Sequence, residues 1–141
     1  MSARRTAVRL KRVYETPAAG DGYRILVDRL WPRGLTKAAA RVDLWMKDVA
    51  PSADLRRWFH ADLDRWPEFR RRYKAELAAG AALEELRAII RERSRREGGG
   101  VTLVFGARDP ERNHALLLLE ALSARGRRGD ARRPRAGGPR S

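Results

Sequence analysis

The chain has no cysteine in its 141 residues. This absence excludes disulfide bonds, zinc sites built on thiolates and a cysteine nucleophile, while it leaves the cellular compartment open. Histidine is scarce too, because His60 and His114 are the only two. Neither stands in a metal-binding motif with acidic partners at the right spacing, so we expect no zinc centre and no metal site built on histidine.

Long hydrophobic runs are also missing. The longest strongly apolar run, residues 115–119, is far too short to span a bilayer. Residues 1–14 alternate charged and short apolar side chains and lack the apolar centre of a signal peptide. We therefore expect a cytoplasmic protein with no membrane partner.

Several nucleotide- and nucleic-acid-binding motifs are absent as well. The chain has no Walker loop, no Gly-x-Gly-x-x-Gly, no zinc finger, no helix-turn-helix and no aromatic RNA-binding motif. The three glycines at 98–100 precede an apolar run, so we interpret them as a connector rather than a phosphate loop. Sequence-specific recognition of DNA or RNA is therefore not expected.

Positive charge is in excess, with 32 Lys+Arg against 18 Asp+Glu and a formal net charge of +14. Residues 123–141 contain seven arginines, one acid (Asp130) and no apolar residue larger than alanine. Such a segment cannot bury enough surface to offset its loss of conformational entropy. We predict a flexible basic arm at 1–6, one domain at 7–122 and a disordered tail at 123–141.

The basic tail has two interpretations that the sequence leaves open. Excess cationic charge attracts polyanions, so the tail favours nonspecific nucleic-acid binding. The alternative is that the richness in arginine reflects a biased genome and carries no function.

Short apolar strands alternate with amphipathic helices along the chain. Strands are predicted at 8–14, 23–28 and 101–105, with a weaker one at 42–49. Helices are predicted at 36–41 with Thr36 as cap, after a Ser52 cap, from 64–67 onward, around 83–90 and after Asp109. This order predicts a single small layered α/β domain, with a short, mostly parallel sheet of about four strands flanked by helices.

Parallel strands place their carboxyl ends on one edge of a sheet, where α/β folds bind ligands. Polar segments at 28–34, 47–52 and 106–114 follow the predicted strands, so we expect them to meet in one concave, electropositive site. The periodic apolar positions predict a core that includes Trp66, Phe69, Tyr73, Leu103, Phe105, Leu118 and Leu119.

Five segments of the chain carry a family resemblance. They read DRLWPRG at 28–34, DLWMKDVAPS at 43–52, LRRWF at 55–59, WPEFRRRY at 66–73 and ARDPERNHA at 107–115. Over residues 8–122 this set resembles the YeaO-like branch of the domain-of-unknown-function family 488. The resemblance implies a bacterial or archaeal cytoplasmic protein with a Rossmann-like α/β fold, and it implies no particular reaction. The first residues and the tail lie outside it.

Two departures from the family pattern bear on function. Relatives follow Trp-Phe with Gly-His-Asp, whereas residues 60–62 here read His-Ala-Asp. The broader family often carries Cys-His-Arg near its last helix, and residues 113–115 here read Asn-His-Ala. A cysteine nucleophile in such relatives would therefore have no counterpart in this chain.

Arginines dominate the predicted binding set, because a guanidinium binds phosphate or carboxylate through two parallel hydrogen bonds. The helix N-terminus after Asp109 adds partial positive charge and free backbone donors. A structural alternative stays open, in which the arginines pair with nearby aspartates and tie loops together. Trp31 either stacks on a base or sugar or plugs the end of the sheet. The predicted anion-binding set is Arg29, Trp31, Arg33, Asp48, Arg108 and Asn113.

Three residues are candidates for catalysis, each with a structural alternative. His114 lies in the first turn of an apolar helix, and imidazole titrates near neutral pH, so it acts as general acid or base or else donates to a nearby carbonyl. Asp109 is either catalytic or an N-cap. Asp28 serves as a base, forms a salt bridge, or holds a hydrated Mg²⁺ together with Asp48. No other cofactor is indicated.

Two functional hypotheses follow from the sequence. The first is an enzyme, or a degenerate enzyme, that binds a phosphorylated or nucleotide-like anion at the strand-end edge. The second is a nucleic-acid accessory protein that uses the basic tail and the arginine-rich stretch 70–74.

Overall fold

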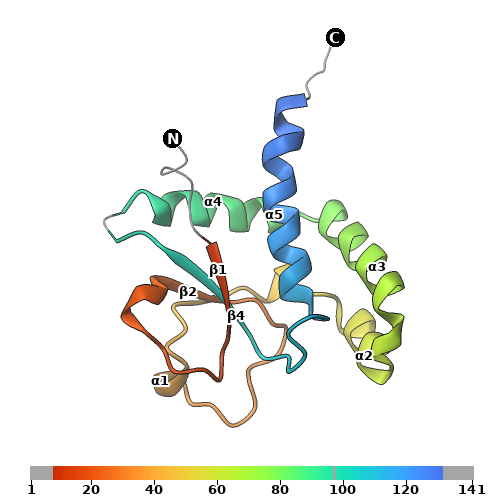
Figure 1. Cartoon of the computed structure of the whole chain (residues 1–141), viewed down its shortest axis with the longest axis horizontal. Helices are drawn as coiled ribbons and strands as arrows, with labels where there is room; N and C mark the ends of the chain where they lie inside the picture. The colour runs from red at the N-terminus through yellow and green to blue at the C-terminus, as the bar shows by residue number, and fades with distance from the viewer. Residues whose placement is uncertain (1–7, 97, 132–141) are drawn as a thin grey trace.

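A sheet of four parallel strands organises the protein (Figure 1). The computed structural model describes residues 8–96 and 98–131. The strands are β1 (Val8–Arg12), β2 (Tyr23–Leu26), β3 (Leu44–Trp45) and β4 (Val101–Phe105), in the order β1-β4-β2-β3. The predicted α/β class, with about four parallel strands, is confirmed.

The central strand is β4, which pairs in parallel with β1 on one side and with β2 on the other. All five of its residues are buried, as expected for a strand covered on both faces. Gly22, with a φ of 67°, lets the start of β2 approach this strand closely. A Cβ at position 22 would collide with the backbone of Gly100, so the register of β2 depends on this glycine.

Four helices cover one face of the sheet: α2 (Ala53–Ala61), α3 (Trp66–Ala79), α4 (Ala82–Ser94) and α5 (His114–Ala131) (Figure 1). Ser52 caps α2 as predicted, because its Oγ accepts from the Leu55 backbone amide at 3.2 Å. Alternate residues of the two central strands, such as Ile25 and Leu103, pack against these helices.

Aromatic side chains fill the centre of this helical layer. Phe69, Tyr73 and Leu77 recur at every fourth position of α3 and form its buried stripe. Phe59 of α2 stacks on Phe69, with ring centroids 4.2 Å apart and planes inclined by 15°. The stripe is therefore core, as the spacing predicts.

The opposite face of the sheet has a thinner cover. A single turn of helix, α1 (Lys37–Ala40), begins at Thr36, whose Oγ1 accepts from the Ala39 amide. Leu26 and Val104 meet a small apolar cluster on this face, with Trp31 packed against it. The loop between β2 and β3 thus takes the place of a longer covering helix.

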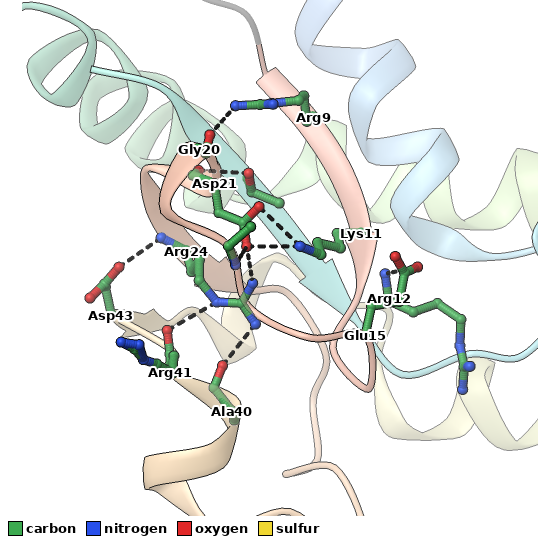
Figure 2. Close-up of polar contacts among 12 residues, drawn as sticks. Arg9, Lys11, Arg12, Glu15, Gly20, Asp21, Arg24, Ala40, Arg41 and Asp43 are labelled. Carbon is green, nitrogen blue, oxygen red and sulfur yellow. Dashed lines mark hydrogen bonds and ion pairs between the residues drawn. The ribbon is translucent and has the colours of Figure 1, made fainter. Parts of the chain in front are cut away.

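A buried polar cluster completes the second face (Figure 2). The Arg24 guanidinium donates to Asp21 Oδ2 at 2.6 Å, to the Ala40 carbonyl at 2.8 Å and to the Arg41 carbonyl at 3.1 Å. Lys11 of β1 pairs with the same carboxylate at 3.1 Å. The cluster therefore ties β1, β2 and the end of α1 together through charge-assisted hydrogen bonds.

The pKa of Asp21 reflects this environment. Burial alone would raise it, but hydrogen bonds from the Ala18 amide, Lys11 and Arg24 outweigh burial and lower the pKa below its ordinary value. The carboxylate is thus stabilised in its charged form, as a buried ion pair requires.

The third strand is shorter than predicted. Only Leu44 and Trp45 of the predicted strand 42–49 form β3, and a 3-10 turn, η3 (Lys47–Val49), follows. The Met46 amide still donates to the Leu26 carbonyl at 2.9 Å, so the ladder extends one step further. The chain then turns because Val49, fully buried, enters the helical side of the core.

The predicted start of the last helix is wrong. Asp109 was expected to cap it with Pro110 in its first turn, but α5 begins at His114. Asn113 Oδ1 accepts from the Leu116 amide at 3.1 Å, which makes Asn113 the capping residue. Asp109 instead closes a tight turn, because its Oδ1 accepts from the amides of Glu111 and Arg112.

The last helix also runs past the predicted domain boundary at residue 122. Its backbone is helical to Ala131, although disorder was predicted from Ser123. Gly126 and Gly129 are poor helix formers, so the continuation depends on the helix already anchored by packed leucines and on the alanine and arginine residues of the segment. The predicted arm at 1–6 and residues 132–141 of the predicted tail lie outside the described residues.

Most of the predicted core is buried. Phe69, Tyr73, Leu103, Phe105 and Leu118 are buried, whereas Trp66 and Leu119 are only partly so. In the part of the chain that the structure describes, no helix has the length and apolar character needed to cross a membrane.

We expect Phe69→Ala to lower the free energy of unfolding by about 3–5 kcal/mol, because the stacked ring leaves a cavity between α2 and α3. Urea denaturation measures this change. The exposed Arg57→Ala serves as the control and should stay within about 0.5 kcal/mol of the wild type. A loss below about 1 kcal/mol for Phe69→Ala would contradict the packing described here.

Candidate functional site

A cavity of about 570 Å³ lies at the carboxyl-terminal edge of the sheet. Its walls come from the loops after β1, β2 and β4, from α2 and from the start of α5. The structure brings most of the predicted site residues to this cavity: Asp28, Arg29, Trp31, Arg33, Arg108, Asp109, Asn113 and His114.

Asp28 and His114 lie side by side in this cavity. His114 Nε2 is 2.9 Å from the Val27 carbonyl oxygen and 3.3 Å from Asp28 Oδ1. Because a carbonyl only accepts, Nε2 carries the proton of the neutral imidazole. Asp28 Oδ2 accepts from the Gly106 amide at 2.8 Å, while Oδ1 is buried without a hydrogen bond from the described residues.

Burial sets the protonation of this pair. Burial raises the pKa of Asp28, although the charge of His114 and the Gly106 hydrogen bond act in the opposite direction. Burial lowers the pKa of His114, and the nearby Asp28 only partly offsets this effect. The pKa of His60 is lowered too, first by burial and then by the charge of Arg56. Neutral imidazoles are therefore favoured at this edge of the sheet.

Two arginines of the cavity bind other groups of the protein through their guanidiniums. Arg29 donates from Nε to the Pro51 carbonyl at 2.9 Å, so it joins the loop after β2 to the start of α2. Arg112 pairs with Asp109 at 3.1 Å and donates to the Leu63 carbonyl at 3.3 Å. Both guanidiniums thus hold loops in place, which is the structural alternative raised for Arg29.

Three other arginines of the cavity have no such ties. The guanidiniums of Arg33, Arg56 and Arg108 make no hydrogen bond or ion pair with any residue of 8–96 or 98–124. The lining holds five arginines against two aspartates, a formal balance of +3. The lining of the cavity therefore carries an excess of positive charge.

Trp31 lies between the cavity and the small apolar cluster on the second face of the sheet. It lines the cavity, but its Nε1 donates to the Leu35 carbonyl at 2.7 Å and its ring packs edge-on against Trp45 at 5.4 Å. These contacts belong to the small apolar cluster on the second face. Its geometry is that of a plug at the sheet end.

Asp109 and Asn113 line the cavity with side chains that serve local structure. Asp109 closes its own turn, and the pKa of its carboxyl is lowered, chiefly by the hydrogen bond from the Glu111 amide. Asn113 Nδ2 donates to the Asp109 carbonyl at 2.8 Å while its Oδ1 caps α5. Their polar atoms therefore orient His114 at the first position of the helix.

Asp48 is the one predicted site residue that the structure does not bring to this cavity. It lines a separate small cavity of about 130 Å³, together with Arg29 and Glu76. The predicted pair of carboxylates for Mg²⁺, Asp28 and Asp48, is thus not assembled. Within residues 8–96 and 98–124, no group of three or more His, Asp or Glu side chains is placed to hold a metal ion.

Several residues of the cavity were not in the predicted site, among them Tyr14, Leu30, Arg56, His60 and Gly106. Tyr14 and Gly106 follow β1 and β4, so the strand-end rule applied to Asp28 reaches them as well. Arg56 and His60 lie four residues apart on one face of α2, a spacing visible in the sequence. The sequence does not show that this face of α2 points toward the edge of the sheet, because only the packing of α2 in the folded domain determines its orientation.

A second, larger groove of about 1100 Å³ lies between α3, α4 and α5. Its charged side chains pair with one another, since Lys74 lies 3.7 Å from Glu120 and Arg87 pairs with Glu84. None of its lining residues belongs to the loops that follow the strands. The strand-end cavity is therefore the stronger candidate for a functional site.

Comparison with known proteins identifies the family. The chain matches the family model DUF488-N3i, described as the inactive DUF488-N3 subclade, over residues 7–139. The chain belongs to this DUF488 subclade. The match confirms the YeaO-like resemblance predicted from the sequence and extends beyond the predicted range of 8–122.

Relatives of this DUF488 protein span its whole domain. An uncharacterised protein of Mycobacterium tuberculosis is 45% identical over 122 residues, which are 86% of this chain and 98% of the relative. The uncharacterised protein YeaO of Escherichia coli is 40% identical over 115 residues, 82% of this chain and 96% of YeaO. No solved structure matches the chain.

The arginine-rich stretch 70–74 has partners within this DUF488 domain. Arg71 and Arg72 pair with Glu68, and Arg70 and Lys74 lie 3.6 and 3.7 Å from Glu120. These exposed ion pairs are weak, yet they neutralise part of the basic surface suggested for nucleic acid.

We expect His114→Gln to flatten the pH dependence of stability between about pH 5 and 7. The folded pKa of His114 lies below its ordinary value of 6.5, so the unfolded chain binds more protons in this window. Wild-type stability should therefore fall as the pH falls, and the variant should lose this contribution. Urea denaturation at a series of pH values measures the difference.

Asp28 contributes to the slope of stability against pH in the opposite direction. Its pKa is raised in the folded protein, so its contribution to stability falls as the pH rises. Because the charge of His114 lowers the pKa of Asp28, replacing His114 raises that pKa further, and this moves the slope of stability against pH in the same direction as the loss of the imidazole. His60→Gln is the matched control and should change the slope less, since the His60 side chain is less buried than that of His114. An unchanged slope in His114→Gln would contradict a buried neutral imidazole.

Proposed function

We propose that this DUF488 protein binds a small anion bearing a phosphate or carboxylate group in the strand-end cavity. The observation that carries the proposal is the convergence of Arg33, Arg56 and Arg108, from separate segments, on one cavity, with no hydrogen bond or ion pair from their guanidiniums to any side chain that the structure describes. Like charges held near one another repel, and an anion between them replaces the repulsion with attraction.

Arginine suits this role because of its shape. The guanidinium presents a planar fork of donors that matches two oxygens of a phosphate or carboxylate. Arg29 and Arg112, held by backbone carbonyls, keep the surrounding loops in position and add positive potential. The site thus combines fixed arginines that shape the cavity with free arginines that meet the ligand.

We infer binding without turnover. The Nε2 proton of His114 is engaged by the Val27 carbonyl, and Asp109 is engaged in its own turn. Asn113 occupies the place where the broader family often carries a cysteine, and its amide group caps α5. The description of the matching subclade as inactive agrees with this inference.

Titration calorimetry with inorganic phosphate tests the proposal. We expect wild-type protein to bind phosphate and Arg56→Ala to weaken the affinity by about 10- to 100-fold, the loss of one or more charge-assisted hydrogen bonds. Arg33→Ala and Arg108→Ala should each weaken it as well. Sulfate should compete, because it offers the same oxygens.

Arg57→Ala is the matched control, since Arg57 neighbours Arg56 in the chain but is exposed and pairs with Asp54. It should bind phosphate as the wild type does. Arg56→Lys keeps the charge and loses the fork, so it should recover only part of the affinity. Equal phosphate binding by Arg56→Ala and Arg57→Ala would refute the proposed site.

A further inference from the structure

Two large apolar side chains remain exposed in the described part of the chain, and both stand at this cavity. Tyr14 is 42% exposed and Leu30 is 57% exposed, and both line the cavity that holds the free arginines. Exposed apolar surface beside a concave site marks a place where a ligand covers it. A bare phosphate has no apolar part to do so.

The Tyr14 side chain is held in place. The Tyr14 hydroxyl donates to the Arg33 carbonyl at 2.8 Å, and the Arg12 guanidinium lies over its ring at 5.1 Å. Arg12 is fixed in turn by the Ala107 carbonyl at 2.9 Å. The ring is therefore positioned at the cavity by the same loop that carries Arg33.

Gly106 joins the apolar part of the site to its polar part. A Cβ at this position would lie 3.1 Å from Asp28 Oδ2 and 3.8 Å from Tyr14 Cε2. The glycine thus lies between the carboxyl group and the aromatic ring, where a side chain would crowd Asp28. All three residues line the same cavity, so its polar and apolar parts are close enough for one ligand with different chemical groups at its two ends.

Resting on the proposed function, we infer that the anion is a nucleoside monophosphate. Its phosphate lies among Arg33, Arg56 and Arg108, and its base lies against Tyr14 and Leu30. A nucleobase has a planar π-face that stacks on an aromatic ring and also contacts aliphatic groups. The cavity volume of about 570 Å³ is within the range of small-molecule sites and exceeds what a single phosphate fills.

Two sources can supply this chemistry, a free mononucleotide and the 5′-phosphorylated end of a nucleic-acid strand. Both present a phosphate next to one nucleoside, so contacts inside the cavity do not distinguish one from the other. A strand adds further phosphates outside the cavity, and binding to these depends steeply on salt.

Calorimetry with full-length protein and three probes tests the inference: inorganic phosphate, ribose 5-phosphate and adenosine 5′-monophosphate. We expect the nucleotide to bind at least about tenfold more tightly than ribose 5-phosphate, because only the nucleotide carries a base that stacks. Leu30→Ser should remove most of this difference. Leu119→Ser, the same substitution in the groove between α3, α4 and α5, should preserve it.

A 5′-phosphorylated oligonucleotide and its unphosphorylated form distinguish the sources. If the phosphorylated oligonucleotide binds more tightly than the free nucleotide, and Leu30→Ser removes this difference, the ligand is the 5′-phosphorylated end of a nucleic-acid strand. Equal binding of both strands, unchanged by Leu30→Ser, leaves the free nucleotide as the ligand, provided that it still exceeds ribose 5-phosphate.

The inference and the proposed function fail in different ways. If phosphate binds through Arg56 but the nucleotide binds no better than ribose 5-phosphate, the inference is overturned and anion binding stands. If no probe binds, or if Arg56→Ala binds every probe as the wild type does, both are overturned.

Discussion

Parallel pairing of β4 with both β1 and β2 is the constraint on which the site depends. Because the three strands run in the same direction, the residues that follow them arrive at one edge of the sheet. The hydrogen bond from the Gly106 amide to Asp28 Oδ2, at 2.8 Å, joins two of these strand ends directly. If any one of these strands ran in the opposite direction, the loop that follows it would lie at the far edge of the sheet and the cavity would lose one of its walls.

The arginines divide into those that build the structure and those that stay available. Arg24 is buried among a carboxylate and two carbonyls, and Arg29 is bound to the carbonyl of Pro51. A guanidinium can leave water only when its donors find such partners. Arg33 and Arg108 keep contact with solvent and have no such partners among the described residues. This division turns a generally basic protein into one with a local electropositive cavity.

Local sequence patterns predicted the sheet, its parallel character and the gathering of polar loops. The continuous apolar run of β4 and the caps at Thr36 and Ser52 are short-range features, and they were right. The start of α5 was wrong because Asp109 and Asn113 are both good caps, and only the position of His114 against Val27 decides between them.

The site itself was only partly predictable. The strand-end rule led to Arg33 and Arg108, but Arg56 and His60 depend on how α2 turns when Phe59 stacks on Phe69. Asp48 was misplaced because the strand was expected to continue, whereas β3 ends after Trp45 and η3 carries the side chain to another cavity. Tertiary packing, rather than local pattern, fixes these positions.

Arginine side-chain NMR during a phosphate titration tests the central claim most directly. Each Nε–H group reports its own hydrogen bonding, so tied and free guanidiniums are observed together in one sample. We predict that the signals of Arg33, Arg56 and Arg108 shift with a single common affinity, while those of Arg29 and Arg24 stay nearly constant. If instead the shifts spread over exposed arginines such as Arg71, or if none of the three responds, the strand-end cavity does not bind the anion.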